Sequence, residues 1–136
     1  MRRIFVLLLV YIILFPYAMT IAARQRKLEK QDLPKSAQFI IENHFPDSYL
    51  CSISMFKKKK EYRVNFSDGV VIFFNAIGDW TYVDCKNKQV PILLIPSWIR
   101  NHIAKDFGPY VRVVMMEKEK KKIKLKLDNG IEIELK

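Results

Sequence analysis

Apolar residues in this sequence recur at two spacings, one typical of helices and one typical of strands. Residues 33–41 place leucine, alanine and isoleucine at offsets of four, seven and eight, which is one face of a helix. Residues 95–107 repeat this spacing with isoleucines. Pro34 and Pro96 stand near the two starts, where a missing N–H costs nothing. We therefore expect two helices, each followed by a proline-containing turn.

Alternating apolar and polar residues follow each expected helix and predict strands. Residues 49–56 alternate so that Cys51 shares an apolar face with Ile53. Residues 70–74 are apolar on both faces, which favours a central strand. The Asp68-Gly69 pair predicts a type I′ hairpin turn, because both central positions of that turn need positive φ. The strands expected in the first half are residues 49–56, 62–66, 70–74 and 80–85, and Asn129-Gly130 repeats the hairpin signal in the second half.

The two halves have the same order of elements. A shift of 62 residues places Pro34 on Pro96, and the order is kept through the strands that follow. This internal repeat predicts two tandem units, residues 33–85 and residues 95–136. The second unit stops one strand earlier, so the expected order is αββββ followed by αβββ. We predict an α+β domain over residues 33–136, with the helices packed on an antiparallel sheet.

The first 23 residues have the layout of a secretory signal peptide. Arg2 and Arg3 precede an unbroken apolar run over residues 4–15, and small residues follow it. Cleavage is expected after Ala22, with Ala18 and Ala23 as alternative positions, and residues 24–32 are expected to form a flexible leader of the mature chain. The alternative is an uncleaved anchor, because about 20 apolar residues span a bilayer. The signal peptide predicts export to the periplasm or the extracellular space.

Charge and cysteine content narrow the classes of partner and compartment. The chain of 136 residues has a formal charge of +10, and removing the two arginines of the signal peptide leaves +8. A positive charge favours contact with acidic surfaces. Cys51 and Cys85 permit one disulfide in an oxidising compartment. The alternative for Cys51 is a small buried side chain on its strand.

Several short motifs occur in a fixed order: Leu33-Pro34, Phe45-Pro46, Asp68-Gly69, Gly78-Asp79-Trp80 and Ile95-Pro96. Through these motifs, residues 33–136 resemble the PepSY-like family of exported bacterial proteins, whose fold is likened to the beta-lactamase inhibitory protein. The sequence departs from the family pattern in its shorter second unit and in Gly108-Pro109, which replaces a Phe-Pro pair. The resemblance implies a periplasmic or surface-exposed binding module.

The inhibitory protein of that comparison binds its enzyme through a concave sheet face. None of its contact residues maps onto a motif of this sequence. The resemblance therefore implies a binding role without implying inhibition of a beta-lactamase.

The sequence offers little for catalysis. His44 and His102 are its only histidines, and neither has a cysteine or serine at the spacing of a catalytic motif. Each lies near an expected helix end, where a histidine interacts with the last carbonyls. The cysteines and histidines also lack the spacing of a zinc site. We expect no enzymatic activity, no catalytic residue, no metal and no cofactor.

Lysines cluster at the same position in both units, the expected turn between the first and second strands. One interpretation is that these turns contact anionic envelope lipid. The alternative is a solvated hairpin tip that discourages strand pairing between molecules. Nucleic acid is not expected as a partner, because no aromatic recognition motif accompanies the lysines. The candidate contacts with an anionic surface are Lys57, Lys58, Lys59, Lys60, Lys118, Lys120, Lys121 and Lys122.

Aromatic residues are the candidates for contact with a partner protein, since tryptophan and tyrosine dominate binding hot spots. The alternative is that they pack in the core. Trp98 falls beside the apolar stripe of its helix, which predicts partial exposure. The candidate contacts are Trp98, Trp80, Tyr82 and Tyr110.

The sequence thus predicts an exported, non-enzymatic protein that binds another envelope or extracellular protein through its sheet face, with inhibition as one form of that role. The alternative function is docking of the lysine-rich tips on anionic envelope lipid or another acidic ligand.

Overall fold

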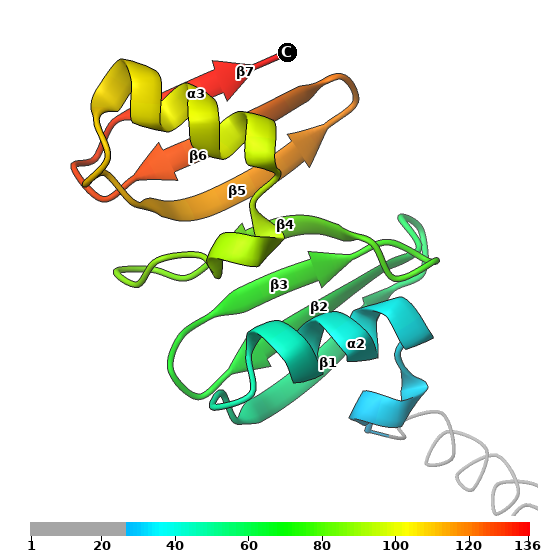
Figure 1. Cartoon of the computed structure of the whole chain (residues 1–136). Helices are drawn as coiled ribbons and strands as arrows, with labels where there is room; N and C mark the ends of the chain where they lie inside the picture. Colours follow the sequence, from blue (N-terminus) through cyan, green and yellow to red (C-terminus); the bar gives the residue numbers. More distant parts are fainter. Residues whose placement is uncertain (1–26) are drawn as a thin grey trace, which may run out of the picture.

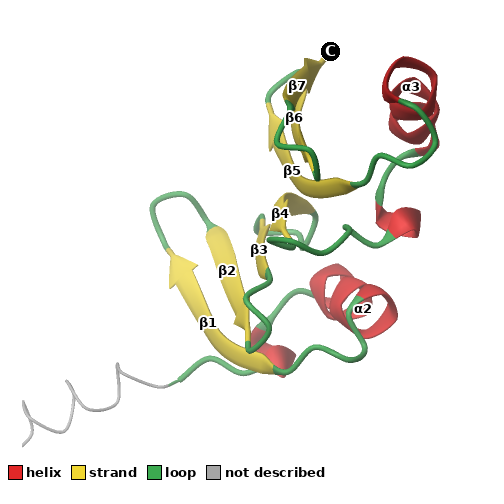
Figure 2. Cartoon of the chain, turned by 90° about the vertical axis from the view of Figure 1, so that its left-hand side faces the viewer, coloured by secondary structure: helices red, strands yellow, loops and turns green. Residues whose placement is uncertain are grey.

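The computed structural model describes residues 27–136, which form one seven-stranded antiparallel sheet with two α-helices on one of its faces (Figures 1 and 2). The predicted signal peptide lies outside the described residues. The α+β class is confirmed. No helix within residues 27–136 is long and apolar enough to cross a membrane. The elements in chain order are η1 (Lys30–Asp32), α2 (Lys35–His44), β1 (Leu50–Phe56), β2 (Glu61–Phe66), β3 (Val71–Phe74), β4 (Trp80–Asp84), η2 (Ile92–Leu94), α3 (Ser97–Phe107), β5 (Val113–Glu119), β6 (Lys122–Leu127) and β7 (Glu132–Leu135).

The core lies between the two helices and the sheet. The strands follow one another across the sheet in chain order, so β4 and β5 join the two halves into a continuous sheet. Helix α2 buries Ala37 and Ile41, and α3 buries Ile99 and Ile103, as their helical spacing predicts. One register row of the sheet lies on this side and comprises Ile53, Val64, Ile72, Val83, Met116, Leu125 and Ile133.

Strands β1 and β5 carry a β-bulge at matching positions. In β1 the pairing shifts between Leu50 and Ser52, so Cys51 is the extra residue, and Val114 has this position in β5. The bulge breaks the alternation expected over residues 49–56. Leu50 packs against the core in place of Cys51, whose side chain is exposed. The expected burial of Cys51 is therefore wrong.

The two cysteines are not bonded to each other. Cys51 lies on β1 and Cys85 directly follows β4, with β2 and β3 between them. Three interstrand spacings of about 4.8 Å amount to roughly 14 Å, whereas disulfide-linked Cα atoms lie within about 7 Å of each other. The disulfide considered from the sequence is therefore wrong.

The hairpin predicted at Asp68-Gly69 forms, but its turn has a different type. Gly69 has a φ of 91°, whereas Asp68 is not among the residues with positive φ. Phe66 N–H donates to the Val70 carbonyl over 3.0 Å, which closes a three-residue loop. This loop is a type I turn followed by a left-handed glycine, so the predicted type I′ turn is wrong. The Asp68 carboxylate instead accepts a hydrogen bond from Val70 N–H at 3.1 Å.

The flexible leader expected before the first helix is wrong for its described part. Residues 30–32 form the 3₁₀ turn η1, in which Glu29 and Asp32 cap each other. Leu28 packs against the core, and Lys30 Nζ lies 3.0 Å from Glu42 of α2. Apolar burial and this ion pair attach the segment to the first helix.

Candidate protein-binding face

The face of the sheet opposite the helices is called the open face here (Figure 2). It presents every second residue of the strands, apart from the bulges. Two complete register rows cross it from β1 to β7. One comprises Ser54, Arg63, Phe73, Tyr82, Glu117, Lys124 and Glu134, and the other comprises Ser52, Asn65, Val71, Asp84, Met115, Lys126 and Glu132.

Four side chains of the open face form a stack that we call the aromatic ladder: Phe56, Arg63, Phe73 and Tyr82. The guanidinium carbon of Arg63 lies 4.0 Å from the ring centroid of Phe56 and 4.5 Å from that of Phe73. Phe73 stacks on Tyr82 with centroids 4.7 Å apart. Glu61 Oε2 lies 3.0 Å from Arg63 Nε and fixes the guanidinium. Cation–π and ring contacts thus hold the ladder in a defined arrangement.

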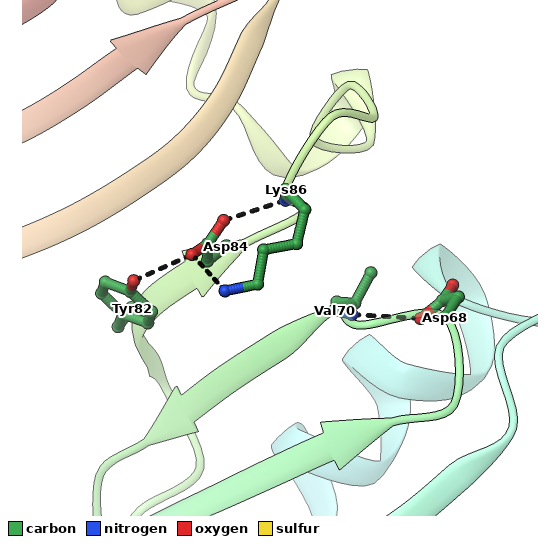
Figure 3. A network of polar contacts seen from close by, with 5 residues as sticks. All are labelled: Asp68, Val70, Tyr82, Asp84 and Lys86. Carbon is green, nitrogen blue, oxygen red and sulfur yellow. Dashed lines mark hydrogen bonds and ion pairs between the residues drawn. The ribbon is translucent and has the colours of Figure 1, made fainter.

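Hydrogen bonds fix the end of the ladder at Tyr82 (Figure 3). Tyr82 O–H donates to Asp84 Oδ2 at 3.1 Å. Lys86 donates to the same carboxylate twice, from its backbone N–H at 2.9 Å and from Nζ at 3.1 Å. Burial by itself would raise the pKa of Asp84, but these hydrogen bonds lower it. Burial first, and the charge of Asp84 second, raise the pKa of Tyr82 to about 12. The phenol therefore stays protonated at neutral pH.

The raised pKa of Tyr82 predicts a loss of stability at alkaline pH. Between pH 10 and about 12 this tyrosine ionises in the unfolded chain but not in the folded one. The unfolded state binds fewer protons in that window, so the free energy of unfolding falls as the pH rises. We expect urea unfolding to show a shallower fall for Tyr82→Phe than for the wild type.

Tyr82→Phe also removes the hydrogen bond to Asp84, and we expect it to lower stability at pH 7 by about 1 kcal/mol. Because Cys85 and Lys118 are present in both proteins, their titration cancels in the comparison. Equal slopes against pH in the two proteins would contradict the assignment to Tyr82.

The open face has a different character on β5–β7. There the side chains are mainly acids and lysines, several of them in ion pairs, rather than aromatic rings. Lys124 Nζ lies 3.0 Å from Glu119 and 4.0 Å from Glu134. Lys122 Nζ lies 3.6 Å from Glu134. The open face therefore has an aromatic half on β1–β4 and an ion-paired half on β5–β7.

The four aromatic residues selected from the sequence do not share one surface. Tyr82 belongs to the aromatic ladder, whereas Trp98 of α3 is 48% exposed, and Tyr110, which follows α3, is 91% exposed. The partial exposure of Trp98 is confirmed. Trp80 is only 6% exposed and lies under Lys118 Nζ, 3.9 Å from its ring centroid, so its placement at a partner contact is wrong.

Sequence reasoning missed Phe56, Arg63 and Phe73 as members of this face. One signal was present, since residues 70–74 are apolar on both faces. An aromatic residue on the side that the helices leave uncovered is the feature that marks such a face.

The lysine-rich turns lie at one end of the sheet. Lys57–60 form the turn between β1 and β2, and Lys120 and Lys121 form the turn between β5 and β6. Because β1 and β5 run in the same direction in the alternating sheet, both turns are at the same end (Figure 1). All six lysines are exposed.

Lys118 and Lys122 are strand residues, so their expected place in the second turn is wrong. Lys118 belongs to β5 and covers Trp80, and burial lowers its pKa. Lys122 belongs to β6 and pairs with Glu134.

Both histidines belong to the helices rather than to the open face of the sheet. His102 Nε2 lies 3.1 Å from Asp106 Oδ2, one turn further along α3. His44 is the last residue of α2. Residues 27–136 contain no group of three or more acidic, histidine or cysteine side chains that could hold a metal ion.

Comparison with known proteins gives a consistent result. The model of a family described as "Putative beta-lactamase-inhibitor-like, PepSY-like" matches residues 19–70 and 60–136, two matches in agreement with an internal repeat. No curated protein matches the chain.

Solved structures of periplasmic proteins share the fold. A "putative periplasmic protein" of the DUF2874 family from Bacteroides vulgatus is 31% identical, with a TM-score of 0.74 over 81% of this chain and 87% of its own. A "putative calcium-regulated periplasmic protein" from Bacteroides thetaiotaomicron is 30% identical, with a TM-score of 0.73 over 84% of this chain and 91% of its own.

Proposed function

This chain belongs to the PepSY-like family, and we propose that it is an exported, non-enzymatic protein that binds another protein through the open face of its sheet. The observation that carries the proposal is the aromatic ladder. It places three aromatic rings and an arginine, already ordered by one another, on a sheet face that the helices leave uncovered.

The composition of the open face suits protein recognition. Aromatic and arginine side chains are enriched at the energetic centres of interfaces, where charged residues other than arginine are depleted. Because Arg63 is already held by Glu61, Phe56 and Phe73, a partner would order few additional side chains on binding. The ion-paired half on β5–β7 supplies the polar rim that interfaces usually have.

Export determines where the partner is sought. The solved relatives are described as "putative" periplasmic proteins, and the first 23 residues have the layout of a signal peptide. The partner is therefore sought among envelope and extracellular proteins, and inhibition of an enzyme is one role that such binding would have.

A second candidate function is docking on anionic envelope lipid. The observation in its favour is that the lysine-rich turns, Lys57–60 and Lys120–121, lie at one end of the sheet and are exposed. Each lysine near an anionic bilayer contributes about 1 kcal/mol, and salt screens this attraction. Co-sedimentation with anionic vesicles that salt abolishes would favour this candidate.

Site-specific photo-cross-linking in the native envelope tests the first candidate. A photoreactive residue replaces Ser54, which is exposed and lies opposite Arg63 in the register. A matched control replaces Lys105, which is exposed on α3. We expect an adduct of one defined mass from position 54 and none from position 105. Arg63→Ala should weaken the complex about thirtyfold, the effect of losing a hot-spot residue of about 2 kcal/mol.

Two controls show whether a weaker complex results from lost binding at the open face rather than from unfolding or from loss of positive charge. Thermal unfolding must show that Arg63→Ala remains folded, and Lys121→Ala, which removes a charge from a lysine turn, should leave the adduct unchanged. Adducts of equal yield from positions 54 and 105, or an adduct that Arg63→Ala does not weaken, would refute binding through the open face.

A further inference from the structure

The two units of the sheet differ at one edge. In the first unit, β3 has β4 beside it, with Ile72 opposite Val83 and Phe73 opposite Tyr82. In the second unit, β7 corresponds to β3, but it pairs only with β6. Within residues 27–136 no strand lies against the outer edge of β7. Its outward backbone N–H and C=O groups therefore have no strand partner in the described chain.

Burial shows what this edge lacks. A shift of 61 residues relates Val70, Ile72 and Phe74 to Ile131, Ile133 and Leu135. The first three residues are buried on the helix side. Their counterparts are more open: Val70 is 3% exposed and Ile131 is 43% exposed, while Ile133 and Leu135 are half-buried. The apolar row along β7 is therefore partly exposed, whereas β4 covers the corresponding row in the first unit.

A recess of about 270 Å³ lies at the Leu135 end of this row. Trp98, Ile123 and Leu135 line it together with charged residues of the second lysine-rich turn and its surroundings: Lys118, Glu119, Lys120, Lys121, Lys122 and Lys136. An apolar side chain from an added strand would enter beside Leu135. The partly exposed row of Ile131, Ile133 and Leu135 on the helix side of the edge favours an added strand with apolar residues at every second position.

The open-face side of the edge selects charge. Glu132 and Glu134 are exposed there. Glu134 already pairs with Lys122 and Lys124 of β6, whereas Glu132 has no ion pair with any residue in the described range. Antiparallel pairing of β7 with a second copy of itself, with the apolar residues kept on the helix side, would set glutamate opposite glutamate. Like charges opposite each other destabilise a sheet. A strand with lysine or arginine at these positions would be complementary instead.

We propose that the outer edge of β7 is a strand-addition site. An extended segment of a partner protein, alternating apolar residues with lysine or arginine, pairs antiparallel with β7 as an eighth strand. Its apolar side chains cover Ile131, Ile133 and Leu135, and its cations lie beside Glu132 and Glu134. This site is separate from the aromatic ladder, which lies on β1–β4.

Hydrogen exchange of the folded protein with a nine-residue peptide of alternating valine and lysine tests the site. We expect the outward amides of β7 to exchange about tenfold more slowly, or slower still, with excess peptide, while amides of β1 at the opposite edge do not change. A peptide with glutamate in place of lysine should have no effect. The lysine peptide with alternate backbone amides methylated should also have none, because it cannot complete the ladder of hydrogen bonds.

A charge exchange makes the test specific. The double variant E132K/E134K changes two exposed residues. We expect this variant no longer to bind the lysine peptide and to bind the glutamate peptide instead. Ser52→Lys with Ser54→Lys adds two cations at the β1 edge and should leave binding at β7 unchanged. Arg63→Ala should also leave it unchanged, so failure of the open-face proposal and failure of this one are distinguishable.

Three results would overturn the proposal. Absence of protection at β7 with excess peptide would mean that β7, as a short charged edge strand, does not accept an added strand. Equal protection by the lysine and glutamate peptides would remove the charge selection. A dimer of the protein that buries β7 in solution would assign the edge to a second copy.

Discussion

Replacing Gly78 by alanine is expected to lower the free energy of unfolding by about 4 kcal/mol. Gly78 has a φ of 91°, in a region that costs other residues about 1–3 kcal/mol. An added Cβ would collide with Ser36 Oγ and would lie 2.8 Å from the backbone nitrogen of Ala37. Overpacking of this kind costs about 1–3 kcal/mol. Because Ala37 N belongs to the backbone of α2, the helix itself would have to move.

The effect is large because the turn of residues 75–79, between β3 and β4, attaches the sheet to α2. Ser36 Oγ–H donates to the Ile77 carbonyl at 2.6 Å, and Asn75 Oδ1 accepts from the N–H groups of Ile77 and Asp79. Displacing the turn disturbs these bonds together with the start of β4. A domain of this size has about 5–15 kcal/mol of stability, so the variant loses a large part of it.

Gly130→Ala is the matched control, measured by urea unfolding beside Gly78→Ala. Gly130 has a φ of 86°, but no atom lies within 4 Å of the position that its Cβ would take. It therefore reports the cost of the backbone conformation alone, about 1–3 kcal/mol. The difference between the two variants measures the contact with α2. Equal losses of stability in the two variants would show that the added Cβ of Gly78→Ala does not disturb the contact between this turn and α2.

The positions of turns and helices were predictable from the sequence because local chemistry decides them. Pro34 and Pro96 are the N-cap residues of the two helices, and the apolar spacing identified the buried sides. Asp68-Gly69 was recognised as a hairpin signal. Its turn type was not, because the same pair also fits a three-residue loop with only the glycine in the left-handed region.

Features that depend on pairing between distant residues could not be predicted in this way. The bulge at Cys51 changes which residues of β1 lie against the helices, and nothing in the alternation of residues 49–56 marks it. The place of Lys118 over Trp80 depends on the register between β4 and β5. The aromatic ladder likewise joins four strands, so its members become neighbours only once the sheet order is known.

The two cysteines are expected to differ in reactivity by about a thousandfold or more at neutral pH. Cys51 is exposed at the bulge of β1, whereas Cys85 is buried. Burial, with the nearby charges of Asp84 and Asp68 second, raises the pKa of Cys85 from 9.0 to about 12. Since the thiolate is the reactive form, this change alone reduces its population by about three powers of ten. Access to Cys85 further requires opening of the core.

Maleimide labelling followed by intact mass measures this difference. We expect one label per folded molecule within minutes and two labels in denaturant, with the fast label absent from Cys51→Ser. Labelling and intact mass after oxidation also test the redox behaviour of the protein. With roughly 14 Å between their strands, the cysteines cannot join within one molecule. Oxidation should therefore give a covalent dimer through Cys51, which Cys51→Ser abolishes. A monomer that loses both thiols on oxidation and regains them on reduction would instead require β1 to leave its place beside β2.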